Sequence, residues 1–133
     1  ISSSMTRTKQ TAEIVNSYIH KKMKIEPRLK ERNVGAYEGL TLKEVQEKYQ
    51  RGYTSEMAYH KTPPGGESSR EVQERVFAVM DELRKNYPDK NILIISHSFI
   101  IRMINKYFNP GISADDFFNF TLKNVEVREF KFL

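Results

Sequence analysis

Two polar residues, His97 and Arg7, occupy positions from which a side chain can act on a bound anion. His97 follows the apolar, β-branched run at 91–96 and directly precedes a second apolar run. Arg7 falls in the first turn of a predicted helix, just after the polar turn at 2–4. Helix amino termini offer free N–H groups to anions, and a guanidinium can hold two phosphate oxygens at once. Each position is therefore a candidate anion site, and at Arg7 a phosphate is the best match.

Each of these residues also has an interpretation without function. A buried histidine is often satisfied by a backbone carbonyl, and an arginine in a first turn opposes the helix dipole and is commonly exposed. In open α/β sheets, however, ligands bind beyond the carboxyl ends of the strands. His97 stands at such an end, which leaves the functional and the structural interpretation equally open.

Apolar residues at helical spacing predict helices at 6–21, 42–49, 69–87 and 99–108. In the first helix, Ser4 or Thr6 is the expected cap, and the shared apolar face is Ala12, Val15, Ile19 and Met23. The second and third helices begin with predicted capping boxes, Thr41 with Glu44 and Ser68 with Glu71. The buried stripe expected for the third helix is Val72, Val76, Val79, Met80 and Leu83.

Two segments are predicted strands. The run at 91–96 is continuously apolar, which is typical of a strand covered by helices on both faces, and 125–132 alternates as a terminal strand. Strands that alternate with helices predict an α/β fold, a three-layer α/β/α sandwich around a mostly parallel central sheet. With 133 residues, we expect a single domain over 1–133.

Composition excludes several other classes. The absence of cysteine removes disulfides, thiolate metal sites and cysteine nucleophiles. No apolar run reaches the roughly 20 residues of a membrane span, and no secretion signal is visible, so we expect a cytoplasmic protein without a membrane partner. The net charge is +5, but the basic residues are mixed with acidic ones and no aromatic residues interleave with them. The positive charge is therefore expected to belong to a solvated face or to attract a small anionic substrate. We expect no nucleic acid partner.

Four segments, in order along the chain, resemble motifs of the histidine phosphatase superfamily, whose fold is phosphoglycerate mutase-like. They are SSSMTRTKQTA at 2–12, LKERNVGAYEG at 29–39, PGGES at 64–68 and IISH at 94–97. The family's Arg-His-Gly segment, which carries its nucleophilic histidine, has no counterpart here. Neither His20 nor His60 follows an arginine or precedes a glycine at the end of an apolar strand, and both are expected at the surface. We therefore expect an N-terminally incomplete domain, a fragment that lacks the first strand and is inactive by itself.

The resemblance implies a phosphatase that acts on a phosphomonoester through a phosphohistidine formed upstream of this sequence. It implies that Arg7 and His97 bind the phosphate, with His97 protonated beside the dianion, and that Glu31 is the proton donor. It implies no metal and no cofactor. An ordinary surface carboxylate is the alternative for Glu31.

Weaker expectations concern Ser98, Glu67 and Arg32 as substrate-binding residues. Ser98 stands where the family usually has glycine or alanine, so its amide is expected to face the phosphate. Glu67 is expected mainly to organise its loop, and Arg32 either reaches a second anionic group or is simply exposed. Substrate choice is expected to depend on the loop at 51–63, where Tyr53, Met57 and Tyr59 either line a pocket or pack.

Three functions are weighed. The short link of 36 positions between Glu31 and Glu67 favours a phosphatase over a cofactor-dependent phosphoglycerate mutase, an isomerase, because the family's mutases carry a longer insertion there. A non-catalytic module that binds a phosphorylated ligand is the third. The expected partner is a phosphorylated small-molecule substrate, and a homodimer is left open.

Overall fold

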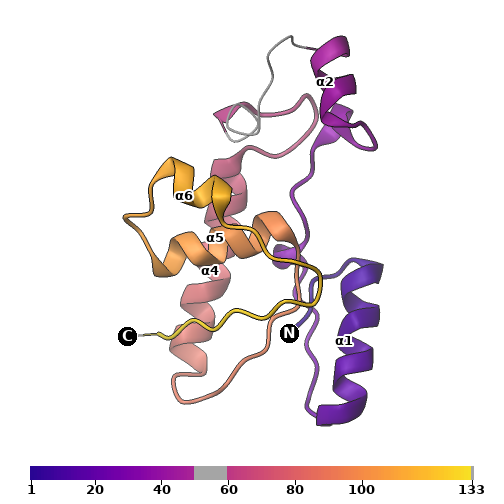
Figure 1. Cartoon of the computed structure of the whole chain (residues 1–133). Coiled ribbons are helices and arrows are strands. Elements are labelled where there is room, and N and C mark those ends of the chain that lie inside the picture. The colour runs from indigo at the N-terminus through magenta and orange to yellow at the C-terminus, as the bar shows by residue number, and fades with distance from the viewer. Residues whose placement is uncertain (50–59, 133) are drawn as a thin grey trace.

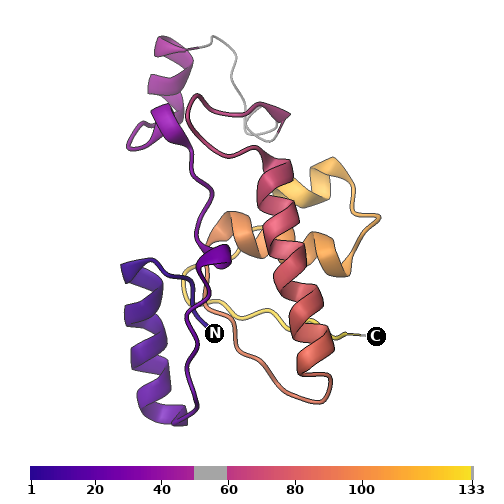
Figure 2. The same cartoon turned by 180° about the vertical axis from the view of Figure 1, so that it is seen from behind.

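The computed structural model describes residues 1–49 and 60–132. Its α-helices are α1 (Thr6–Ile19), α2 (Leu42–Lys48), α4 (Ser69–Asn86), α5 (Ser98–Phe108) and α6 (Ala114–Asn119), with short 3-10 helices η1 (Pro27–Leu29) and η2 (Gly35–Tyr37). Figures 1 and 2 show α1 on one side of a set of extended segments and α4 with α5 on the other, while α2 lies at the far end. Tyr53, Met57 and Tyr59 lie outside the described residues.

Helix α4 forms the centre of the core, as the sequence predicts. Its capping box is present, with Ser68 Oγ accepting the N–H of Glu71 and the Glu71 carboxylate accepting the N–H of Ser68. The predicted stripe is buried without exception, and the core it forms also contains Leu29 of η1, Ile100, Met103 and Ile104 of α5, and Phe117 of α6. Burial of such side chains contributes about 1.5 to 3 kcal/mol each. The packing of α5 against α4 therefore fixes the position of the first turn of α5.

Helix α2 also begins with its predicted capping box, formed by Thr41 and Glu44. Helix α1 begins at Thr6, as predicted, but its cap and its end differ from the prediction. Met5 is its N-cap, without a side-chain cap, and His20 ends it in the left-handed conformation with its N–H on the Asn16 carbonyl. Asn16 Oδ1 then accepts the next backbone N–H, which prevents a further helical turn.

The predicted apolar face of α1 is only partly correct. Ala12 is buried and Val15 half-buried, whereas Ile19 and Met23 are exposed. The helix is held by a narrow stripe near its first turns and presents its carboxyl end to solvent.

The predicted sheet is reduced to two parallel bridges in the part of the chain that is described. Ser2 bridges to Ile25 on one side and to Ile95 on the other. Ser2 donates to the Lys24 carbonyl at 2.9 Å, and Ser3 donates to the Ile95 carbonyl at 3.0 Å. The parallel direction agrees with the prediction, and the α/β arrangement is present, but no longer strand is formed in 1–49 or 60–132.

Two strand predictions are therefore wrong in extent. The 91–96 segment forms a bridge only at Ile95, and Leu93 is 42% exposed, so the segment is not covered on both faces. The 125–132 segment forms no bridge, and Val125 and Val127 are exposed. A strand needs a hydrogen-bonded neighbour, and within the described residues the 91–96 segment pairs only with the first residues of the chain, through the backbone of Ile1 and Ser3.

Helix α6 was not predicted. Ser113 caps it by accepting the N–H of Asp116, and Phe117 inserts into the core against Phe99. Phe130 and Phe132, from the segment predicted as the last strand, pack on Phe108. None of the described helices is long and apolar enough to cross a membrane.

Candidate functional site

His97 is the N-cap residue of α5, at the end of the extended segment that the sequence predicts to carry it. The residue is 6% exposed, and each ring nitrogen has a partner. Arg7 Nη2 lies 3.0 Å from Nδ1, and Ser3 Oγ lies 2.8 Å from Nε2. A guanidinium only donates, so Nδ1 accepts from Arg7 and Nε2 carries the proton that Ser3 Oγ accepts. The contacts thus select one neutral tautomer.

The electrostatics agree with a neutral ring. Burial, and then the charges of Arg7 and Arg75, lower the pKa of His97 from 6.5 to about 4. The family resemblance implies a protonated His97 beside a dianionic phosphate. In this arrangement the ring becomes protonated only if an anion offsets the two arginines, because a nearby negative charge favours the charged imidazole.

Ser3 and Arg7 reach His97 because the first residues of the chain are pinned between two extended segments. Ser2 and Ser3 are fully buried, and Ser2 O accepts the N–H of Glu26 at 2.8 Å. Thr8, one turn into α1, donates its hydroxyl to the Ser3 and Met5 carbonyls at 3.2 and 2.8 Å. This fixes the first turn of α1 and places Arg7 at the start of α5. Sequence reasoning placed Ser3 in a polar turn but did not predict its contact with His97.

Glu31 lies at the same helix terminus. Its Oε1 accepts the N–H of Arg32 at 2.9 Å, and the N–H of Phe99, in the first turn of α5, also donates to the carboxylate. Burial raises the pKa of Glu31, and these hydrogen bonds together with the charges of Arg7 and Arg75 oppose that rise without cancelling it. The structure therefore brings Glu31, Arg7 and His97 together, and Glu31 is a half-buried carboxyl with an increased tendency to hold a proton.

Arg32 is buried, so the expectation of an exposed arginine is wrong. Only 7% of the residue is exposed, and its guanidinium donates to the carbonyls of Glu67 and Lys61 at 2.9 and 3.1 Å. It also lies over the Phe99 ring, 5.2 Å from the centroid. The buried guanidinium of Arg32 is tolerated because its N–H groups donate to backbone carbonyls. Arg32 joins the loop around Glu67 to the start of α5.

Glu67 is held by Arg75 and Asn33. Its two oxygens accept from Arg75 Nε at 2.9 Å and Nη2 at 3.1 Å, and the N–H of Asn33 adds a third bond at 2.9 Å. Burial alone would raise the pKa of Glu67, but the Arg75 hydrogen bond, the Asn33 N–H and the Arg75 charge hold it below its ordinary value. Glu67 is thus an ionised carboxylate that organises its loop, in agreement with the main expectation for it.

Arg75 is the residue of this region that sequence reasoning missed. It lies on α4 between Val72 and Val76, two buried positions of the core stripe. A charged residue at the edge of a buried stripe is a weak signal, because it equally marks an exposed boundary. Ser98 occupies the first position of α5, and its side chain is exposed.

The loops that carry Glu31 and Glu67 meet at a close backbone junction. Gly35 has φ +52°, and a Cβ there would lie 2.2 Å from the Pro64 carbonyl oxygen. The N–H of Ala36 donates to the same carbonyl at 2.9 Å, and Glu67 N–H donates to the Asn33 carbonyl at 2.8 Å. Glycine is required at position 35 both for its backbone conformation and for the close approach.

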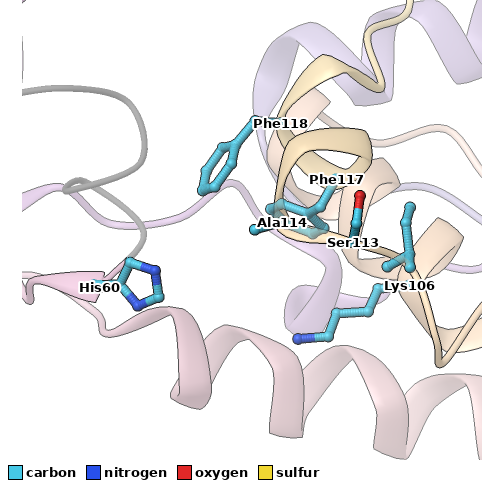
Figure 3. A pocket seen from close by; sticks show the side chains of 7 residues that line it. His60, Lys106, Ser113, Ala114, Phe117 and Phe118 are labelled. Carbon is cyan, nitrogen blue, oxygen red and sulfur yellow. The ribbon is translucent and has the colours of Figure 1, made fainter.

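A cavity of about 160 Å³ lies beside α6 (Figure 3). Its lining consists of His60, Lys106, Ile112, Ser113, Ala114, Phe117 and Phe118, and none of the residues around His97 is among them. Phe117, which lines the cavity, also packs edge-on against Phe99 in the first turn of α5, with ring centroids 6.1 Å apart. His60 is exposed, as expected.

Two of the known proteins that resemble the chain in sequence are named as phosphatases. The chain is 28% identical to the uncharacterized phosphatase PhoE of Bacillus subtilis, over 98% of this chain and 65% of that protein. It is also 28% identical to a metal-independent phosphoserine phosphatase of Arabidopsis thaliana, over 99% of this chain and 57% of that protein. The chain thus spans less than two thirds of the length of these relatives.

A solved structure shares the fold. The mycobacterial glucosyl-3-phosphoglycerate phosphatase superposes with a TM-score of 0.77 at 21% identity, covering 92% of this chain and 64% of that one. The family model of the histidine phosphatase superfamily, branch 1, matches residues 1–133. With its phosphoglycerate mutase-like α/β fold, the chain belongs to the histidine phosphatase superfamily.

Proposed function

We propose that the chain carries the phosphate-binding and proton-donating residues of a phosphomonoester phosphatase that acts through a phosphohistidine. The observation that carries this proposal is the convergence of Arg7, His97 and Glu31 at the amino terminus of α5. A guanidinium, an imidazole and free helix N–H groups are the groups that stabilise phosphoryl oxygens as charge spreads over them. Membership of the superfamily and phosphatase relatives support the same conclusion.

The proposed roles are those that the family resemblance implies, and the contacts of Arg7, His97 and Glu31 support them. Arg7, whose guanidinium already faces His97, binds two phosphoryl oxygens, and His97 donates to the same group once the bound dianion has raised its pKa. As the nucleophilic nitrogen bonds to phosphorus, the ester P–O bond breaks and the leaving oxygen takes the proton of Glu31. Water then attacks phosphorus, the P–N bond breaks, and Glu31 takes a proton from the water. Burial of Glu31 suits it to hold that proton.

The nucleophile in this proposal lies upstream of the given sequence. The sequence has three histidines. His97 is held by Arg7 and Ser3, His20 is exposed at the end of α1, and His60 lines the cavity beside Phe117 and Phe118. We therefore propose that a further histidine completes the site in the full-length protein, and that the 133-residue chain binds phosphate without turning over an ester.

Ser98 is proposed as a phosphate contact through its backbone N–H, because it is the first residue of α5. Arg32 and Glu67 already hydrogen-bond within the protein, Arg32 to the Lys61 carbonyl and Glu67 to the Asn33 N–H. We therefore propose that these two residues shape the rim of the site.

The test is turnover of p-nitrophenyl phosphate by the full-length protein, without added metal. Arg7→Ala and His97→Ala are each expected to reduce kcat by more than about 100-fold, the scale of a lost charge-stabilising group. Arg70→Ala and His20→Ala are the matched controls, because both residues are exposed. Wild-type turnover in either site variant would contradict the assigned roles.

Two further outcomes identify other functions. Phosphate binding by the full-length protein without any ester hydrolysis would identify a binding module. Transfer of the phosphoryl group to a second hydroxyl in preference to water would identify a mutase.

A further inference from the structure

The guanidinium of Arg75 connects α4 to two other segments, the loop at Glu67 and the 28–31 stretch. The residue lies on α4, and its side chain is 14% exposed. Nε and Nη2 donate to the two carboxylate oxygens of Glu67, Nη1 donates to the carbonyl of Arg28, and Nη2 also lies 3.4 Å from the carbonyl of Glu31. A planar fork can satisfy these acceptors together, which a lysine ammonium cannot do.

The acceptors of Arg75 bracket the segment that leads to the proposed proton donor. The Arg28 and Glu31 carbonyls lie at either end of a four-residue stretch whose middle, Leu29, is fully buried. Ser96, next to His97, donates its hydroxyl to the Leu29 carbonyl at 2.8 Å. The backbone of Glu31 is therefore held from α4, while its carboxylate is held by the Phe99 N–H of α5.

The charge of Arg75 is balanced inside the cluster by Glu67, so Arg75 is not free to bind phosphate itself. Arg75 also lies close enough to the site that its charge lowers the pKa of both His97 and Glu31. A residue that holds the donor's backbone without facing the phosphate affects proton transfer more than it affects phosphate binding.

From these contacts we propose that Arg75 is a positioning residue, which holds the 28–31 segment against α4 so that the Glu31 carboxyl stays at the start of α5 and delivers its proton to the leaving group. This inference rests on the proposed function, because it gives Arg75 a task in the same reaction. Its specific consequence concerns leaving groups. p-Nitrophenolate departs with little help from a proton, whereas an alkoxide needs one.

The kinetic test compares two substrates in the full-length protein, p-nitrophenyl phosphate and β-glycerol phosphate. Arg75→Met is expected to reduce kcat for β-glycerol phosphate at least about 10-fold more than for p-nitrophenyl phosphate, because general acid catalysis contributes about 100-fold or more. Arg75→Lys, which keeps the charge but not the fork, is expected to show the same preference to a smaller degree. Arg70→Met is the matched control, on the same helix but paired with Glu74 in solvent. Equal losses on both substrates would overturn the proposal.

A second readout does not depend on turnover. In the 133-residue chain, the backbone amide of Phe99 reports its hydrogen bond to Glu31, and its chemical shift and exchange protection are expected to change in Arg75→Met and Arg75→Lys but not in Arg70→Met. An unchanged Phe99 amide in folded Arg75→Lys would show that Arg75 does not position Glu31. If the full-length wild type hydrolyses neither ester, the proposed function fails, and the Phe99 amide still decides whether Arg75 holds Glu31.

Discussion

Replacing Arg7 by methionine removes the cation whose Nη2 lies 3.0 Å from Nδ1 of His97. In the wild type, burial and the charges of Arg7 and Arg75 lower the pKa of His97 from 6.5 to about 4. We expect Arg7→Met to raise the pKa of His97 by about one unit, without restoring it to 6.5.

The magnitude follows from the contributions. The lowering from 6.5 to about 4 corresponds to roughly 3 kcal/mol in favour of the neutral ring. Burial contributes most, so Arg7 accounts for less than half. Two unit charges about 4 Å apart interact by about 1 kcal/mol in water and about 4 kcal/mol near a protein surface. Arg7 is exposed, so the lower value applies, and the lost hydrogen bond to the neutral ring acts in the same direction.

The assay is an NMR titration of the His97 ring protons in the 133-residue chain, with Arg70→Met as the control for loss of a remote positive charge. The expected sign is that the folded wild type keeps His97 neutral well below pH 6.5, and that the variant protonates it earlier as the pH falls. A wild-type His97 that titrates near 6.5, or an unchanged pKa in Arg7→Met, would refute the reasoning.

Three further predictions concern stability, each measured by urea unfolding of the 133-residue chain. Burial raises the pKa of Glu31 above its ordinary value of 4.5. At pH values between the unfolded and the folded pKa, the folded state therefore binds more protons than the unfolded state. The stability that Glu31 contributes is consequently lost as the pH rises through the folded pKa. Glu31→Gln is therefore expected to gain stability relative to the wild type between pH 4 and pH 7, whereas Glu13→Gln, on the exposed side of α1, is not; parallel pH profiles for Glu31→Gln and the wild type would contradict this. Gly35→Ala is expected to cost roughly 3 kcal/mol or more, because its Cβ would meet the Pro64 carbonyl, while Gly65→Ala, at φ +69° in open space, costs only the left-handed penalty of about 1 kcal/mol; equal costs would show that the junction yields. Ile100→Ala is expected to cost about 2 to 5 kcal/mol, against at most about 0.5 kcal/mol for Ile14→Ala at a 65% exposed position, and a small loss at Ile100 would mean that the core refills the space.

Local signals in the sequence were sufficient to predict the helices that begin with a capping box. Ser68 with Glu71 and Thr41 with Glu44 determine where α4 and α2 begin, because both members of each box lie within one turn. The end of α1 was less accessible, since it depends on His20 adopting a left-handed conformation that a non-glycine residue rarely takes. The predicted extent of the strands was wrong for a different reason. An apolar run shows that a segment is suited to pairing, but its extent depends on neighbours elsewhere in the chain.

The candidate site shows the same division. His97 was placed correctly at the start of a helix because an apolar strand and an apolar helix flank it in the sequence. Arg7 and Glu31 were connected to it only through the family resemblance, since 90 positions separate Arg7 from His97 and no periodicity spans such a distance. Arg75 was missed because its partners, Glu67 and the 28–31 backbone, become neighbours only after the loops fold onto α4.

The hydrogen bond between Ser3 and His97 closes a loop of 94 positions, which has a consequence for folding. Contacts between distant positions form after local ones, because the chain must first lose the entropy of closing the loop. The α4 and α5 core joins segments much closer in sequence, so we expect it to form before residues 1–3 dock onto it. A species with this core packed but with Ser2 and Ser3 undocked would keep much of its helical signal and lack a phosphate site. Phosphate that binds only the docked state would then stabilise the docking of the first residues, and hydrogen exchange at the Ser3 amide would report it.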